Sequence, residues 1–139
     1  MKHPRSPYDQ VGGIVYLGRM LDKIRLQAAD ELPADCVENL GKGFDKRCAS
    51  FLRVSYEDLA AEVRSGLSDE EVLDWCFVHG QQPDEEQIEI WNEFMRKRGW
   101  NDAGTETLIM RKKQSGLEHR DDIVTMFAYI DADEGRPVS

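Results

Sequence analysis

Apolar residues recur at helical spacing in almost every segment of this 139-residue chain. In residues 12–30, for example, Ile14, Leu17, Leu21 and Ile24 fall on one face when successive residues are placed about 100° apart. No segment shows a convincing alternation of apolar and polar residues, which a half-buried strand would need. The pattern therefore predicts an all-α fold, a compact array of about six to seven short helices.

Capping residues and glycines mark the boundaries of the predicted helices. Ser68 and Glu71 have the spacing of a capping box, and Ser55 with Asp58 gives a similar signal. Gly66 and Gly99 stand where helices should end. Residues 31–43 are predicted to be a connecting loop with room for one short turn. No linker divides the chain, so residues 1–139 are predicted to form a single helical domain. We expect helices over residues 12–30, 44–54, 56–65, 69–79, 83–98, 105–115 and 121–130.

Charge is unevenly distributed along this acidic chain. The formal net charge is −9, and residues 54–95 hold twelve acidic residues against one basic residue. This band would repel a phosphate backbone, so nucleic-acid binding is disfavoured. No apolar run approaches the roughly 20 residues that cross a bilayer, and residues 1–10 lack the apolar core of a signal peptide. We therefore expect a soluble, cytoplasmic protein without a membrane partner.

A cluster of charged residues lies on the first predicted helix. Arg25 falls on its apolar face, one turn after Asp22, whereas Arg19 and Lys23 are expected to point away from that face. A charge among apolar side chains must be paired or bind a ligand, because an unpaired buried ion is very costly. One interpretation is an anion site in which Asp22 holds Arg25 beside the glycines at the helix start. The alternative is a structural Arg25, fixed by Asp22 and backbone carbonyls.

Metal binding is not expected from the sequence. Cys76 and His79 lie one turn apart, and Cys36 and Cys48 complete a possible zinc set, but structural zinc usually draws on closer pairs. The cysteines are few and odd in number, which indicates reduced thiols. The spacing of Cys76 and His79 leaves a Cys–His nucleophile as a weaker alternative. Residues 131–135 resemble the start of a calcium loop, but the glycine stands at the wrong position and the segment is better interpreted as a solvated acidic tail. No cofactor fingerprint and no reaction motif is present, so catalytic residues stay unknown.

Three motifs carry a resemblance to a known family. They are the pattern Gly-Gly-Ile-x-x-Leu-x-Arg-x-x-Asp-Lys-x-Arg that starts at Gly12, the segment Ser-Asp-Glu-Glu-Val-x-x-Trp that ends at Trp75, and the pair Trp91-Asn92. The chain resembles, over most of its length, a family of short bacterial proteins defined by domain of unknown function 5069. The resemblance supplies no reaction, substrate or cofactor. It implies only which residues occupy the family's motif positions: Arg19, Asp22, Lys23, Arg25, Trp75, Trp91 and Asn92.

Two hypotheses about function follow. The first is a non-enzymatic interaction or regulatory module that meets a protein partner. The second is a binder, or an enzyme, for a small anionic metabolite that uses Arg19, Asp22, Lys23 and Arg25, with the tryptophans and Asn92 as further candidate ligand contacts. A cavity on which several of these groups converge would favour the second hypothesis. The absence of a visible nucleophile or acid–base pair favours the first.

Overall fold

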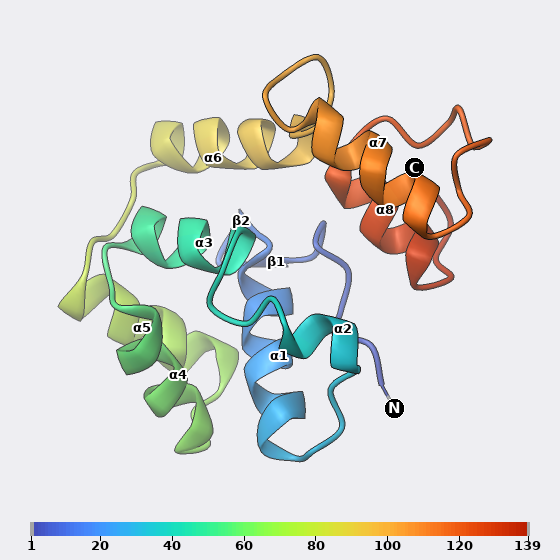
Figure 1. Ribbon diagram of the computed structural model, residues 1–139. Helices are drawn as coiled ribbons and strands as arrows, with labels where there is room; N and C mark the ends of the chain where they lie inside the picture. Colours follow the sequence, from blue (N-terminus) through green and yellow to red (C-terminus); the bar gives the residue numbers. More distant parts are fainter. Residues whose placement is uncertain (1, 139) are drawn as a thin grey trace.

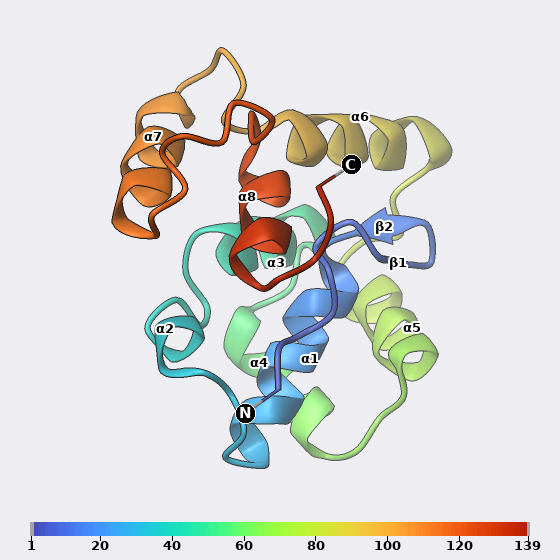
Figure 2. The same ribbon diagram turned by 90° about the vertical axis from the view of Figure 1, so that its right-hand side faces the viewer.

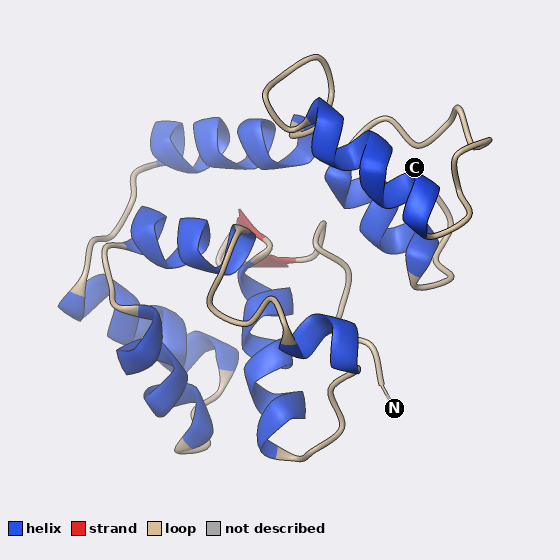
Figure 3. Cartoon of the chain, in the orientation of Figure 1, coloured by secondary structure: helices blue, strands red, loops and turns tan. Residues whose placement is uncertain are grey.

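Helices dominate the structure, as the apolar spacing predicts (Figures 1 and 3). The computed structural model describes residues 2–138, and within that range it has eight helices and one short hairpin. None of the helices in this range has the length and apolar character that crossing a bilayer requires. The elements are β1 Gln10–Val11, β2 Ile14–Val15, α1 Leu17–Ala28, α2 Ala34–Val37, α3 Phe44–Leu52, α4 Tyr56–Arg64, α5 Asp69–His79, α6 Glu85–Lys97, α7 Thr105–Gln114 and α8 Met126–Asp133.

The hairpin before α1 was not expected. Gly12 and Gly13 have φ of 60° and 81°, and they join two antiparallel strands of two residues each. Two consecutive positive φ angles are typical of a type I′ turn, which glycine adopts without a steric penalty. The prediction of a helix from residue 12 is therefore wrong by five residues, since α1 begins at Leu17.

Side-chain caps set the starts of α4 and α5, as predicted. Ser68 and Glu71 form a complete capping box at α5, and the Ser55 hydroxyl accepts the Asp58 backbone N–H at α4. A second capping box, between Asp84 and Gln87, opens α6. Each of these contacts satisfies backbone groups that the first helical turn leaves without partners.

The last helix begins later than predicted. The expected range was residues 121–130, but α8 runs from Met126 to Asp133 because the Thr125 side chain caps it at Ala128 N–H. The acidic segment 131–135 is only partly solvated, contrary to expectation: the side chains of Asp131 and Glu134 are each 7% exposed, whereas Asp133 is exposed. Asp131 and Glu134 are both engaged by Arg136. Asp131 also accepts from the Ser6 hydroxyl and Glu134 from Arg19 on α1, and these contacts fix the end of α8 against the rest of the chain.

Two apolar clusters lie at either side of the molecule. The larger one surrounds α1 and takes residues from the hairpin, from α3 to α6 and, through Phe127, from α8. The smaller one joins α7, α8 and the loop between them through Leu108, Ile123, Ala128 and Tyr129. α6 passes over α3 and leads to the α7–α8 pair, so that this pair stands beside the main body (Figures 1 and 2).

Candidate functional site

A cleft of about 610 Å³ lies between the α2–α3 region and the α7–α8 pair. Its wall combines apolar side chains with an unusual number of charged ones. The charged lining residues are Arg19, Lys23, Asp35, Glu38, Lys42, Arg47, Arg98, Arg111, Asp133 and Glu134. Clefts of this size that combine apolar surface with convergent polar groups are typical ligand sites.

Two arginines of the cleft stack on one aromatic ring. The guanidinium carbon of Arg47, on α3, lies 5.0 Å from the centroid of Phe94, and that of Arg98, at the end of α6, lies 5.5 Å from it. Stacking on a ring orients a guanidinium while its in-plane N–H groups stay available for an acceptor. Arg98 also has a longer ion pair of 3.6 Å with Asp102. Phe94 thus orients both cations.

A third arginine enters the cleft from α7. The Nε atom of Arg111 is buried and has no hydrogen-bond partner among residues 2–138. A buried donor without an acceptor costs free energy. Because the protein covers Nε, a ligand in the cleft can contact only the terminal N–H groups of Arg111, which have no ion pair within 4.0 Å among residues 2–138. Beside it, the hydroxyls of Ser115 and Tyr129 contact each other and line the same cleft.

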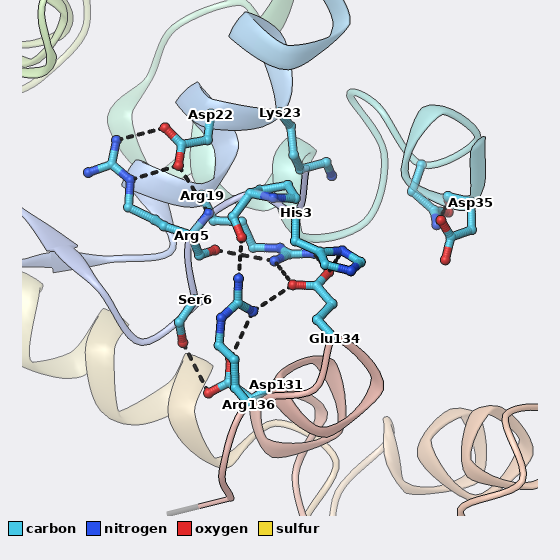
Figure 4. A network of polar contacts seen from close by, with 12 residues as sticks. His3, Arg5, Ser6, Arg19, Asp22, Lys23, Asp35, Asp131, Glu134 and Arg136 are labelled. Atoms are coloured by element: carbon cyan, nitrogen blue, oxygen red, sulfur yellow. Dashed lines mark hydrogen bonds and ion pairs between the residues drawn. The ribbon is translucent and has the colours of Figure 1, made fainter. Parts of the chain in front are cut away.

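Arg19 was expected to be exposed, and this expectation is wrong. The residue is 5% exposed, and its guanidinium donates to both oxygens of Glu134 at 2.8 and 2.6 Å (Figure 4). Burial opposes the charge on Arg19, but the contact with Glu134 outweighs it and raises the pKa of Arg19. Arg136 donates to the same carboxylate at 2.6 Å. This network joins α1 to the end of α8 and forms one edge of the cleft.

Lys23 is also buried, contrary to expectation. Its ammonium lies 3.0 Å from each oxygen of Asp45, which is 0% exposed. The Tyr16 hydroxyl donates to the same carboxylate at 2.6 Å, and the backbone N–H of Gly41 does so at 3.0 Å. Burial, reinforced by the Asp45 charge, raises the pKa of Tyr16 well above its usual value of 10. These four groups satisfy one another at the floor of the cleft.

Asp22 and Arg25 lie outside the cleft. Arg25 is paired mainly with Asp69, at 2.8 Å, and only loosely with Asp22, at 3.6 Å. Its side chain is 34% exposed, so it stands at the edge of the apolar face rather than within it. Asp22 instead accepts the backbone N–H and the guanidinium of Arg5. The predicted cluster is therefore split between two sides of α1.

The motif residues Trp91 and Asn92 hold the hairpin. The indole N–H of Trp91 donates to the Val15 carbonyl at 3.1 Å. The Asn92 side chain accepts the Val15 N–H and donates to the Gly13 carbonyl, at 3.1 and 2.8 Å. Neither residue lines the cleft, and neither does Trp75, which stacks on His79 with ring centroids 4.8 Å apart.

The cysteines are free thiols in different places. Cys48 and Cys76 are buried, and burial raises the pKa of Cys76 to about 12, which disfavours a thiolate. His79 turns its Nδ1 toward the Trp75 carbonyl at 3.0 Å. Residues 2–138 contain no group of three or more His, Cys, Asp or Glu side chains placed to hold a metal ion. The expectation of a protein without metal stays a prediction.

Sequence reasoning missed the arginines of the cleft. Nothing in the sequence spacing of Arg47, Arg98 and Arg111 connects them. They meet because three elements distant in the sequence converge on one cleft. Of the predicted site residues, only Arg19 and Lys23 line it.

The comparisons with known proteins agree with the resemblance seen in the motifs. A comparison with curated proteins gives no match. The model of a protein family described as "Domain of unknown function (DUF5069)" matches residues 1–136. The chain therefore belongs to the DUF5069 family.

Proposed function

We propose that the cleft binds a small organic anion and that Arg47, Arg98 and Arg111 supply the positive charge that holds it. The observation that carries this proposal is that three guanidinium groups line one cleft, and that neither Arg47 nor Arg111 has an ion pair within 4.0 Å among residues 2–138. A carboxylate or phosphate oxygen would supply an acceptor for their N–H groups. Arg47 and Arg98, stacked on Phe94, stand in the same wall.

Arg19 and Lys23 have a different role in this proposal. Their charges are already matched by Glu134 and Asp45, so they shape the wall rather than supply free positive charge. Asp22 and Arg25 contribute to stability on the other side of α1. The proposal is for binding, and it assigns no reaction to the cleft.

The protein-partner hypothesis stays a prediction. A shallow apolar groove lies between α3 and α6, where Ile90 is 62% exposed and Phe94 is 38% exposed. Nothing on this groove identifies which protein would cover it. The cytoplasmic location and the single-domain organisation also stay predictions.

Isothermal titration calorimetry with n-butyl phosphate, at low ionic strength, tests the anion site. Replacing Arg111 by Met keeps the length and the apolar contacts of the side chain but removes the charge. A hydrogen bond to a charged group is worth about 1.5–3 kcal/mol, so Arg111→Met should raise Kd by about tenfold or more.

Arg64→Met is the matched control, because Arg64 is exposed on α4, away from the cleft. It should leave Kd unchanged. Absence of any binding, or an equal loss in both variants, would contradict the proposal.

A further inference from the structure

The groove between α3 and α6 has an apolar floor that is open to solvent. The rings of Phe51 and Trp91 form this floor and stack with their centroids 4.7 Å apart. Ile90 and Phe94, which are 62% and 38% exposed, border it on the α6 side. The groove has a volume of about 500 Å³. Contiguous apolar surface that no side chain of the protein covers is typical of a binding site.

The charges around the groove favour an anionic occupant. The chain has a formal net charge of −9, and α6 itself carries four glutamates. None of these carboxylates lines the groove, and the one charged side chain in its lining, among residues 2–138, is that of Arg47. A groove without carboxylates and with a guanidinium at its border is complementary to an anion rather than to a cation.

Arg47 lines the cleft as well, so the groove and the cleft meet at this residue. Its guanidinium carbon lies 5.0 Å from the ring centroid of Phe94, and that of Arg98, another residue of the cleft, lies 5.5 Å from the same centroid. The Phe94 ring itself lines the groove. An acidic group that contacts these two cations is therefore next to the apolar surface of the groove.

The position of Arg47 also gives the groove a direction. The cations stand at its Phe94 end, and Gln87 lines it seven residues earlier on α6. Seven helical residues correspond to about 10 Å along the helix axis. Carbon–carbon bonds of about 1.5 Å at tetrahedral angles advance about 1.3 Å each along an extended chain. The groove between Phe94 and Gln87 therefore has the length of roughly eight methylene groups.

We propose that the ligand is an anionic amphiphile, a phosphate or carboxylate that carries a hydrocarbon chain. Its acidic group contacts Arg47 and Arg98, and its chain lies in the groove on Phe51, Ile90 and Trp91. This inference rests on the proposed anion site and adds the apolar half of the ligand. The occupant is a single dissolved molecule and not a bilayer, because the exposed glutamates of α6 are repelled by an anionic lipid surface.

A series of n-alkyl phosphates with two to twelve carbons tests the chain. Titration calorimetry on the full chain, at pH 7.5, low salt and concentrations below micelle formation, measures Kd for each. Full burial of one methylene group tightens binding about fourfold, so an open groove that covers one side of the chain should give about twofold per methylene. This gain should level off beyond about eight carbons, where the groove ends.

The n-alcohols of the same lengths test the acidic group. They should bind about tenfold or more weakly than the phosphates, because they lack the charged acceptor. Arg47→Gln should raise Kd by a similar factor for every phosphate in the series, since it removes one of the cations and leaves the apolar floor in place.

Two exposed isoleucines give a matched pair of variants. Ile90→Gln should raise Kd about threefold or more for octyl phosphate and leave Kd for ethyl phosphate unchanged, because only the longer chain reaches this side chain. Ile109→Gln is the control. Ile109 is 59% exposed on α7 and lines neither the groove nor the cleft, so its replacement should leave the whole series unchanged.

The other outcomes separate this inference from the anion site. If ethyl and butyl phosphate bind and longer chains bind no more tightly, the inference is wrong while the anion site stands. If no alkyl phosphate binds, the anion site is wrong and the inference falls with it. Alcohols that bind as tightly as phosphates would show that the cations do not hold the ligand. Sedimentation with phosphatidylglycerol vesicles, without binding of the soluble probes, would assign the groove to a bilayer and overturn the inference.

Discussion

The ammonium of Lys23 lies 3.0 Å from both carboxylate oxygens of Asp45, and the two side chains are only 5% and 0% exposed. An ion pair this deeply buried stays favourable only while both partners are present, because removing one leaves an uncompensated charge. Lys23 was predicted to point into solvent. Its burial makes it a structural residue at the floor of the cleft.

Lys23→Met should therefore lower the free energy of unfolding by about 3–5 kcal/mol. The double variant Lys23→Met with Asp45→Asn should recover a large part of this loss, since no unpaired charge remains. Urea denaturation followed by circular dichroism measures both. A loss below about 0.5 kcal/mol for Lys23→Met, the size expected at an exposed site, would show that the pair is not buried in solution.

A second prediction concerns the pH dependence of the Arg19–Glu134 contact. Burial disfavours the charge on Glu134, but Arg19 and then Arg136 outweigh it and lower the pKa of Glu134 below its usual 4.5. A carboxylate whose pKa is lowered by folding stabilises the fold above its unfolded pKa and loses that contribution as the pH falls. The loss should begin near pH 4.5 and continue below it.

Unfolding free energies of the wild type and of Glu134→Gln, measured between pH 7 and pH 3, test this prediction. At pH 7 the wild type should have a larger free energy of unfolding than Glu134→Gln, and the difference between the two free energies should shrink below pH 4.5. Glu85→Gln, at an exposed position of α6, is the control. A difference that stays constant over the whole range would contradict the assigned shift.

The helices could be predicted because their signals are local. Ser68 and Glu71 form their capping box across three residues of the same chain segment, and nothing distant is needed to form it. The hairpin depends instead on Asn92, which lies 79 residues from its partner Gly13. No periodicity in a two-residue strand reveals such a contact.

The candidate site depends even more on distant contacts. A helical projection correctly places Lys23 on the polar face of α1. It does not show that α3 covers this face with Asp45, which stands 22 positions after Lys23 in the chain. In the same way, no local pattern reveals that Arg47 and Arg98 meet at Phe94. Charges that pair across elements are visible only in the fold.

The third prediction concerns Asp22, which the sequence analysis paired with Arg25. Asp22 is 27% exposed, and its main partner is Arg5 at 28%. Partly exposed ion pairs contribute little, typically up to about 1 kcal/mol, and the lost contact with the Arg5 backbone N–H adds about 1 kcal/mol. Asp22→Ala should thus destabilise the protein by about 1–2 kcal/mol, clearly less than Lys23→Met. If Asp22→Ala and Lys23→Met lower the free energy of unfolding equally in the same denaturation series, the partial exposure of Asp22 does not determine its contribution to stability.

The final prediction compares the two glycines of the hairpin turn. Both have positive φ, so an alanine at either position is strained by roughly 1–2 kcal/mol. They differ in the space around them: a Cβ on Gly12 would stand 2.4 Å from Cδ2 of Leu73, whereas a Cβ on Gly13 meets nothing within 4 Å. Gly12→Ala must also displace the Leu73 side chain and should therefore cost more than Gly13→Ala.

Thermal unfolding of the two alanine variants and of Gly13→Asn measures this difference. Asparagine tolerates positive φ better than alanine does, so Gly13→Asn should be the mildest of the three changes. Gly12→Ala should cost less when Leu73 is already alanine. The Tm difference between Leu73→Ala and the double variant Leu73→Ala with Gly12→Ala should be close to the Tm difference between the wild type and Gly13→Ala. If Gly12→Ala and Gly13→Ala lower Tm equally, the contact between the turn and α5 does not constrain the hairpin.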